Sequence, residues 1–150
     1  GAWLQENMPE TERPGLIHGD YHPDNTLVSA ETPELTAIID WELATVGDPL
    51  LDLGALFATW PDAEGKSPLG NSTGVLKGLP SAGELIEHYR ERSSRDLSAI
   101  DWYGVLACYR LGIILEGTHA RACSGRANQQ IGDLLHATTV ALFERALTLI

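Results

Sequence analysis

The sequence predicts a mainly helical domain with a small β-hairpin, an α+β fold that occupies residues 1–150 as a single domain. The length of 150 residues is typical of one domain. A hydrophobic content of 43% is enough for a core and excludes a disordered tail. Two short β-like runs lie near the N-terminus, whereas helix-start signals recur through the rest of the chain.

The first elements are expected to be short. Residues 1–8 have the character of the end of a helix, which the following proline-containing stretch terminates. Residues 18–25 are too rich in turn-forming residues for a regular element. The runs 26–29 and 35–39 are β-like, and the five residues between them suit a turn, so together they predict a hairpin.

Two helices are expected next. Asp48 can cap a helix whose first position is taken by Pro49 and which runs to about Trp60. Residues 61–80 hold several Gly and Pro without periodicity and predict a long surface loop. Ser81 and Glu84 form a capping box that opens a helix ending near residue 93.

The C-terminal half predicts two longer helices, over 98–122 and about 126–149, with Gly125 as the break between them. At 100° per residue, one stripe of the first helix is apolar except for Glu116. We expect Glu116 to pair with a nearby Arg or His or to reach solvent, and the alternative is a carboxylate that lines a substrate pocket. The stripe consists of Trp102, Leu106, Tyr109, Ile113, Glu116 and Ala120.

Charge and cysteine content exclude several classes of function. Ten Lys and Arg against 21 Asp and Glu give a formal net charge of −11, which disfavours general binding to nucleic acid or to an anionic membrane. The two cysteines, Cys108 and Cys123, cannot form a disulfide framework or a four-cysteine zinc site, which favours a reducing compartment. No apolar run approaches the length of a membrane span. A cytoplasmic location is therefore expected, with neither nucleic acid nor membrane as partner.

The chemistry is concentrated in the stretch His18-Gly-Asp-Tyr-His-Pro-Asp-Asn25 and in Asp40 after the hairpin. Asp20, Asn25 and Asp40 offer hard oxygen ligands, which suit Mg²⁺. The spacing His-x-Asp-x-x-x-x-Asn is also the catalytic-loop pattern of protein kinases, where the Asp accepts the substrate hydroxyl proton and the Asn holds a metal. The Gly of the kinase Asp-Phe-Gly motif is missing, which points away from protein kinases proper.

Three motifs together resemble the aminoglycoside phosphotransferase family of small-molecule kinases. They are His18-Gly-Asp-x-His-Pro-x-Asn25, Ile39-Asp-Trp41 and Gly47-Asp-Pro-x-x-Asp-Leu-Gly54. The run from Ile39 to Gly54 is most similar to a branch that includes the kinase-like domains fused to acyl-CoA dehydrogenases. The motifs cover residues 16–60, and the helical remainder is compatible with the C-terminal lobe of the kinase-like fold.

This resemblance implies transfer of the γ-phosphate of ATP to a hydroxyl group of a small molecule, with Mg²⁺ as cofactor. It implies that Asp20 is the general base and that Asn25 and Asp40 are the metal ligands. Asp52 is expected to accept backbone N–H bonds from the catalytic loop, and Trp41 is expected to lie in the core. The residues expected to support the loop are His18, His22, Asp48 and Asp52, and the candidate substrate contacts are Glu42 and Glu116.

A kinase also needs an N-terminal nucleotide lobe, and only 17 residues precede the catalytic loop. Lys66 and Lys77 follow the metal ligands and so lie on the wrong side of the sequence for the phosphate-binding Lys. We therefore expect an isolated C-terminal lobe with little or no kinase activity of its own. The surface on which the missing lobe would rest is expected to be exposed and to favour a homo-oligomer. Its apolar residues are expected to include Trp3, Leu4, Leu27 and Val28.

Two other functions remain open, as does the acceptor. The first is a non-catalytic relative that binds a ligand or partner. The second is a metal-dependent hydrolase that uses His18, Asp20, His22 and Asp40. The acidic composition suits a cationic acceptor such as an aminoglycoside or choline, whereas the branch resemblance points to hydroxylated acyl or related metabolites.

Overall fold

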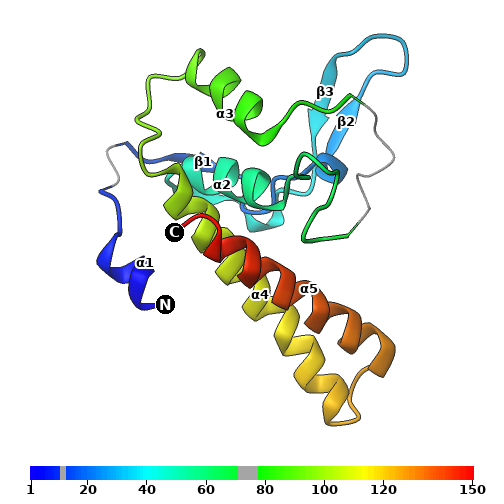
Figure 1. Ribbon diagram of the computed structural model, residues 1–150. Coiled ribbons are helices and arrows are strands. Elements are labelled where there is room, and N and C mark those ends of the chain that lie inside the picture. The colour runs from blue at the N-terminus through cyan, green and yellow to red at the C-terminus, as the bar shows by residue number, and fades with distance from the viewer. Residues whose placement is uncertain (11–12, 71–77) are drawn as a thin grey trace.

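Two long antiparallel helices form the base of the molecule. The computed structural model describes residues 1–10, 13–70 and 78–150. Helices α4 (Ile100–Cys123) and α5 (Gln129–Leu147) run side by side, and their far end projects away from the rest of the chain (Figure 1). Gly125, with φ of +73°, lies in the turn between them, as expected, because this left-handed conformation favours glycine. Asn128 caps α5 by accepting a hydrogen bond from the Ile131 N–H at 3.1 Å.

Helix α2 (Leu50–Thr59) packs on the other side of α4, and the core lies between these helices. One group of buried residues joins Leu4, Ala58, Val105, Cys108, Leu142 and Ala146. A second group joins Leu50, Leu97 and Tyr103. Helix α3 (Ala82–Arg90) begins at the expected capping box, in which Ser81 and Glu84 bond each other's backbone N–H. The core therefore fixes the position of α2, the helix that follows the predicted metal ligands.

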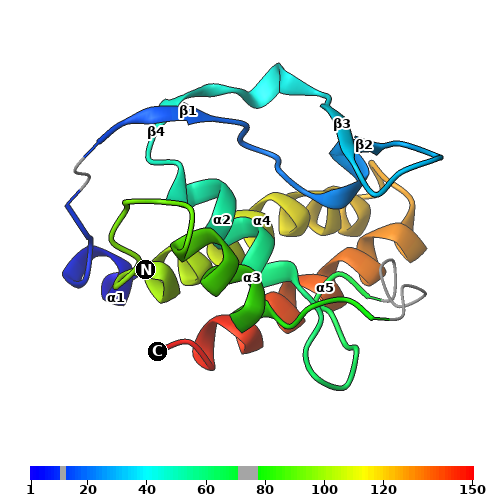
Figure 2. The same cartoon turned by 90° about the horizontal axis from the view of Figure 1, so that it is seen from above.

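Four short strands carry the loops on top of this helical base. Strands β2 (Thr26–Val28) and β3 (Leu35–Ile38) form the predicted antiparallel hairpin, in which Thr26 pairs with Ile38. Strands β1 (Gly15–Ile17) and β4 (Thr45–Gly47) form a second antiparallel pair, which the sequence pattern did not predict. Figure 2 shows the β1–β4 pair crossing above α2 and α4, with the β2–β3 hairpin further along the same side.

Several expectations about packing are wrong. The buried positions of α4 include Tyr103, Gly104, Cys108 and Gly112, whereas Ile113 of the predicted stripe is 51% exposed. The reason is that α4 is contacted on two sides, by α2 and α5, and small residues occupy the points of closest approach. At Gly112, for example, a Cβ would lie 2.6 Å from Phe143 Cε1. Because such small residues mark the packed face, the pattern of hydrophobic residues alone did not indicate it.

The N-terminal helix α1 (Ala2–Glu6) also differs from expectation, because it packs against α4. Leu4 is buried in the core, Trp3 packs against it, and the Trp102 indole N–H donates to the Leu4 carbonyl at 2.9 Å. Trp3 and Leu4 are therefore not part of an exposed lobe surface. The loop expected over 61–80 has no helix or strand in its described parts, 61–70 and 78–80, and Lys77 lies outside the described residues. Within the described chain, no helix is both long enough and apolar enough to cross a bilayer.

Candidate active site

The catalytic loop, residues 18–25, is anchored by a carboxylate from the first turn of α2. The His18 N–H donates to Asp52 Oδ2 at 2.6 Å, and the Gly19 N–H donates to Asp52 Oδ1 at 2.9 Å. These are the contacts expected for Asp52. Because one rigid side chain on a packed helix holds two consecutive amides, the start of the loop takes its position from α2.

The His18 ring connects the loop to the end of strand β3. The side chain is buried, and its Nε2 lies 2.8 Å from the Ile39 carbonyl oxygen, which can only accept. Its Nδ1 lies 3.3 Å from the Asp20 backbone nitrogen, which can only donate. These two contacts require Nε2 to donate and Nδ1 to accept. Both ring nitrogens are therefore used in positioning the loop, as expected for a structural histidine.

Gly19 allows the chain to turn between His18 and Asp20. Its φ is +85°, and a Cβ at this position would lie 2.5 Å from the Leu43 carbonyl oxygen. A side chain is therefore excluded both by the left-handed backbone and by the close approach of the segment after β3. This turn presents the Asp20 side chain at the surface of the loop.

Asn25 closes the loop on Asp20. Its buried side-chain amide donates to the Asp20 backbone carbonyl at 2.9 Å and to Asp20 Oδ2 at 3.3 Å. His22 lies on the other side of this carboxylate, with Nε2 at 3.5 Å from Asp20 Oδ2. The second ring nitrogen of His22 faces Asp24 at 3.8 Å. Asp20 is thus held by one amide donor and stands beside one imidazole.

Asp40 is brought to the same place by the hairpin. The Ile39 N–H donates to the Asn25 carbonyl at 2.9 Å, which extends the β2–β3 pairing by one residue, and Asp40 follows directly. Asp40 is exposed, and its φ of 63° and ψ of 56° lie in the left-handed region. Among the described residues other than glycine, Asp40 alone has a positive φ. The two segments that hold the predicted base and metal ligands therefore meet, as the motif spacing predicts.

Trp41 lies on this site and not in the core, so that expectation is wrong. It is 43% exposed, its indole N–H donates to the Ile38 carbonyl at 2.7 Å, and its ring lies 4.8 Å from the His18 ring. Trp41 begins the short 3-10 helix Trp41–Leu43, which turns the chain from β3 toward β4. Trp41 therefore lies against the catalytic loop. Its aromatic character alone suggested burial in the core, because residue type does not distinguish these two places.

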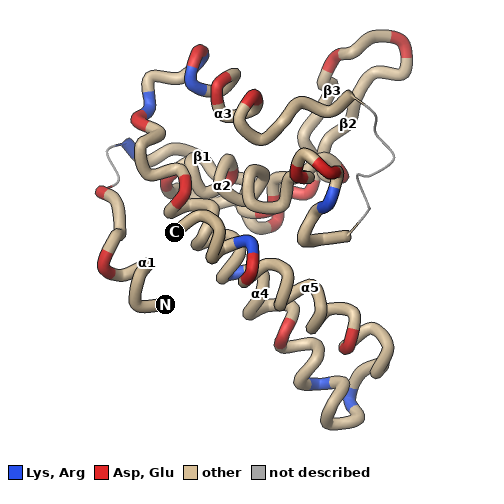
Figure 3. The backbone as a smooth tube through the Cα atoms, viewed as in Figure 1, with Lys and Arg blue, Asp and Glu red and all other residues tan. Residues whose placement is uncertain are grey.

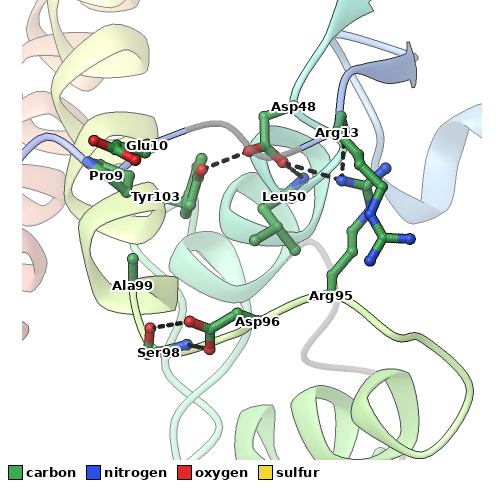
Figure 4. A pocket seen from close by; sticks show the side chains of 10 residues that line it. All are labelled: Pro9, Glu10, Arg13, Asp48, Leu50, Arg95, Asp96, Ser98, Ala99 and Tyr103. Atoms are coloured by element: carbon green, nitrogen blue, oxygen red, sulfur yellow. Dashed lines mark hydrogen bonds and ion pairs between the residues drawn. The ribbon is translucent and has the colours of Figure 1, made fainter.

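Asp48 supports α2 and α4 and makes no hydrogen bond to the catalytic loop in the described structure (Figure 4). Its Oδ1 accepts from the Leu50 N–H at 3.0 Å, which is the expected cap, and Oδ2 accepts from the Tyr103 hydroxyl at 2.7 Å. Burial and this hydrogen bond raise the pKa of Tyr103 well above its ordinary value. Arg95 Nη1 lies 4.0 Å from Asp48 Oδ1 and donates to the Arg13 carbonyl. These residues line a small cavity of about 250 Å³.

A much larger open cavity of about 810 Å³ begins at the catalytic loop and extends over α2, α4 and α5. Asp20, His22 and Asp52 lie at the loop end, whereas Asn25 and Asp40 are not among its lining residues. Arg110 adds a positive charge to the lining. The apolar wall includes Leu51, Leu56, Leu106, Leu111, Ile114, Leu134 and Leu135. The cavity can accept a small molecule with its reacting group near Asp20 and an apolar body along the helices.

The two candidate substrate carboxylates lie outside this cavity lining. Glu42 is exposed on the 3-10 helix after Asp40. Glu116 lies on α4 and accepts hydrogen bonds from His119 and His136, which is the pairing that we expected. Helical spacing places Arg110 and Arg121 off the predicted stripe, where they could either recognise an anionic acceptor or be solvated, and the structure puts Arg110, but not Arg121, in the cavity lining.

The site stands in a strongly acidic stretch. Between Arg13 and Lys66 the sequence has no Lys or Arg, yet it holds ten of the 21 acidic residues. Figure 3 marks the positions of the acidic residues in red along the backbone. Asp20 and Asp40 offer carboxylate oxygens, and Asn25 offers an amide oxygen as a third possible ligand. This donor set fits Mg²⁺, which prefers carboxylate and amide oxygens together with substrate phosphates.

Comparisons with known proteins agree with this geometry. Residues 2–103 match the phosphotransferase enzyme family. Acyl-CoA dehydrogenase family member 11 of Rattus norvegicus is 31% identical over 99% of this chain, which spans 20% of that protein. Acyl-CoA dehydrogenase family member 10 of Mus musculus is 29% identical over 88% of the chain, which spans 13% of that protein.

A solved structure has the same fold. It comes from Ralstonia eutropha and carries the provisional name aminoglycoside phosphotransferase. It superposes with a TM-score of 0.76 at 26% identity and matches 98% of this chain. The matched part is 47% of that protein, so the chain spans about half of the solved neighbour and a fifth or less of the two curated relatives.

Proposed function

Because the chain belongs to the phosphotransferase enzyme family, we propose that it forms the catalytic-loop half of a kinase that phosphorylates a hydroxyl group of a small molecule. The observation that carries this proposal is the meeting of Asp20, Asn25 and Asp40 at the end of the β2–β3 hairpin. The phosphoryl donor in this proposal is ATP. A cytoplasmic location, where ATP is available and thiols stay reduced, fits the two free cysteines.

Asp20 acts as the general base. Its carboxylate accepts the proton of the acceptor hydroxyl while that oxygen attacks the γ-phosphorus of ATP, and the bond from this phosphorus to the bridging oxygen of ADP breaks. Asn25 holds the Asp20 side chain through its amide N–H, and His22 borders it. The position of Asp20 at the cavity end supports this role, since a base has to reach the acceptor.

Asn25 and Asp40 would hold Mg²⁺ beside the catalytic loop. When bound, the ion offsets the negative charge of the transferring phosphoryl group. The absence of Lys and Arg from the whole stretch 14–65 supports this assignment, because the phosphates of ATP would otherwise face carboxylates without a compensating cation.

The nucleotide would be bound mainly by a part of the protein beyond these 150 residues. Exposed apolar side chains on the strands and between β3 and β4 support this, namely Leu16, Leu27, Val28, Leu35, Leu43 and Val46. Each of these side chains is between 47% and 73% exposed. Exposed apolar side chains of this kind suit a tightly packed partner, here an N-terminal lobe, and without that lobe they favour self-association. We propose that the chain alone has little or no kinase activity.

The cavity favours a particular class of acceptor. Its helical wall carries leucine and isoleucine side chains together with Arg110, whereas Asp20, Asp24 and Asp52 lie at the loop end. This combination supports a hydroxylated molecule with an apolar body and an anionic group on the part that lies along the helices, such as a hydroxylated acyl compound. A polycationic aminoglycoside would meet the carboxylates at the loop end but would place its other amines against leucine side chains and Arg110, which is unfavourable.

A metal-dependent hydrolase is less well supported than a kinase. That alternative needs His18 as a ligand, but both of its ring nitrogens are engaged with backbone groups. A non-catalytic relative is also less well supported, because the base and both metal ligands are present together.

The test is an assay of the longest natural protein that contains these residues, with ATP, Mg²⁺ and a panel of hydroxy acids, neutral alcohols and aminoglycosides. Asp20→Asn keeps the shape of the loop and removes the base, so kcat should fall roughly 100- to 10,000-fold while the KM for ATP changes little. Asp101→Asn, at an exposed position of α4, is the matched control. An unchanged kcat in Asp20→Asn contradicts the assignment of the base.

The acceptor class is tested separately. Arg110→Gln should raise the KM for a hydroxy acid and leave the KM for a neutral alcohol unchanged, with Arg126→Gln as the control outside the cavity. Equal effects on both acceptors, or phosphorylation of aminoglycosides alone, would contradict the proposed acceptor. Turnover by the 150-residue chain comparable to that of the longer protein would contradict the need for a second lobe.

A further inference from the structure

A group of metal-ligand side chains lies between α4 and α5, apart from the catalytic loop. Glu116 and His119 come from α4, and His136 comes from α5. Each offers one ligand atom, and these atoms all lie within 4.8 Å of one another. None of the three lines the cavity that begins at Asp20. They therefore form a site of their own on the projecting helix pair (Figure 1).

The Glu116 carboxylate is shared by two imidazoles. His119 Nδ1 lies 2.9 Å from Oε1, and His136 Nδ1 lies 2.9 Å from Oε2. The two rings lie beside each other with centroids 4.4 Å apart. One carboxylate therefore holds both imidazoles close together between α4 and α5.

Two further donors stand on the far side of His119. Cys123 Sγ lies 3.3 Å from His119 Nε2, and Asp133 Oδ1 lies 3.8 Å from the same atom. Glu116, His119 and Cys123 follow one another at spacings of three and four residues, which puts them on one face of α4. Both groups therefore contact the His119 nitrogen that faces away from Glu116, and they orient this ring rather than reach an ion bound at Nδ1.

The backbone brings the two helices close at this point. A Cβ placed on Gly132 would lie 2.4 Å from the Cβ of Ala122. The missing side chain lets α5 pass directly against α4, one turn from His119 and His136. The ligand residues are therefore held by packed backbone and not only by exposed side chains.

We propose that Glu116, His119 and His136 bind a divalent transition-metal ion, with zinc as the best match. Two imidazoles and one carboxylate form a donor set that zinc favours and that Mg²⁺ does not. Tetrahedral zinc with bonds of about 2.0 Å needs donor atoms about 3.3 Å apart, and modest side-chain rotation brings the three atoms to that spacing. The ion clamps α4 to α5 and leaves a fourth position for water.

The test is calorimetric titration of the 150-residue chain with zinc chloride. We expect one zinc ion per chain, and an affinity that falls by about 100-fold in His119→Gln and in His136→Gln. His88→Gln, at an exposed position of α3, is the matched control and should bind zinc as the wild type does. Excess Mg²⁺ should not displace the zinc.

A second readout protects the test against variants that fold poorly. Far-UV circular dichroism checks each fold, and zinc should raise the Tm of the wild type and of His88→Gln but not of His136→Gln. Cobalt in place of zinc should give the visible absorption of a tetrahedral site. Absence of saturable binding overturns the proposal, as does binding that survives both substitutions or that depends on His22 instead.

Discussion

Replacing Gly54 with alanine should lower the stability of the chain, because the steric cost of packing α2 against α4 exceeds the gain in helix propensity. A Cβ at this position would lie 2.5 Å from Tyr103 Cβ, 2.7 Å from the Tyr103 carbonyl carbon and 2.9 Å from its oxygen. Two of these atoms belong to the backbone of α4, which cannot move aside as a flexible side chain can. The substitution therefore has to push the two helices apart.

The magnitude follows from two opposing effects. Overpacking an interior costs about 1–3 kcal/mol, and contact with backbone atoms puts Gly54→Ala at the upper end. Alanine gains about 1 kcal/mol over glycine in a helix, so the net loss is about 2 kcal/mol. For a chain of 150 residues, this lowers Tm by about 4–8 °C.

The same substitution at Gly117 is the matched control. Gly117 also lies within a helix, but no atom comes within 4 Å of its Cβ position, so only the propensity gain applies. Gly117→Ala should raise Tm by about 2–4 °C, opposite in sign to Gly54→Ala. Thermal and urea unfolding followed by circular dichroism measure both. If Gly54→Ala melts at or above the wild-type temperature, α2 and α4 are not in the close contact described here.

Three further perturbations have definite outcomes. Asp52→Ala removes the charged acceptor of two loop amides and should lower the free energy of unfolding by about 2–3 kcal/mol, with faster amide exchange at the loop. The backbone N–H and the hydroxyl of Ser81 lower the pKa of Glu84 below its ordinary value of 4.5. Because the folded pKa is the lower one, the capping contribution is complete above the ordinary value and is lost as pH falls through the folded pKa. Glu84→Gln should abolish this acid dependence, which a pH series of α3 amide shifts would detect, and an unchanged profile would exclude the capping carboxylate as its source. Burial raises the pKa of Cys108 to about 11, so a thiol reagent should label exposed Cys123 alone in the native chain and both cysteines after unfolding.

The sequence predicts the path of the chain around the candidate site because that path depends on local contacts. The spacing from His18 to Asn25 fixes one loop, and the turn between residues 28 and 35 returns the chain beside it. Asp40 then has to follow the strand that pairs with Asn25. The bond from Asp52 to the loop was expected from the resemblance, since it joins residues more than 30 positions apart.

The parts that the sequence did not predict depend on contacts between distant segments. Strands β1 and β4 are three residues each, too short for a periodic pattern, and they form only when the chain after β3 returns to Gly15. The packed face of α4 is marked by glycine and cysteine, whose small size matters more there than their hydropathy. Trp41 is apolar but covers the catalytic loop, and no local pattern distinguishes such a residue from a core tryptophan.

The proposed zinc site contains one local contact that the sequence can predict and one contact between distant segments that it cannot. Glu116 and His119 are three residues apart on one helix, so their pairing can be derived from the sequence. His136 joins them only because Gly132 sets the register of α5 against α4. That register requires the three-dimensional packing, and so the third ligand was missed.

The left-handed backbone of Asp40 places stability and activity in opposition at one residue. A non-glycine residue in this region carries strain of about 1 kcal/mol or more, so glycine at position 40 would relax the hairpin end. The same change would delete the carboxylate assigned to the metal. Selection for stability alone would therefore tend to remove the carboxylate and with it the activity. In a chain no longer selected for catalysis, glycine or asparagine would be expected at position 40.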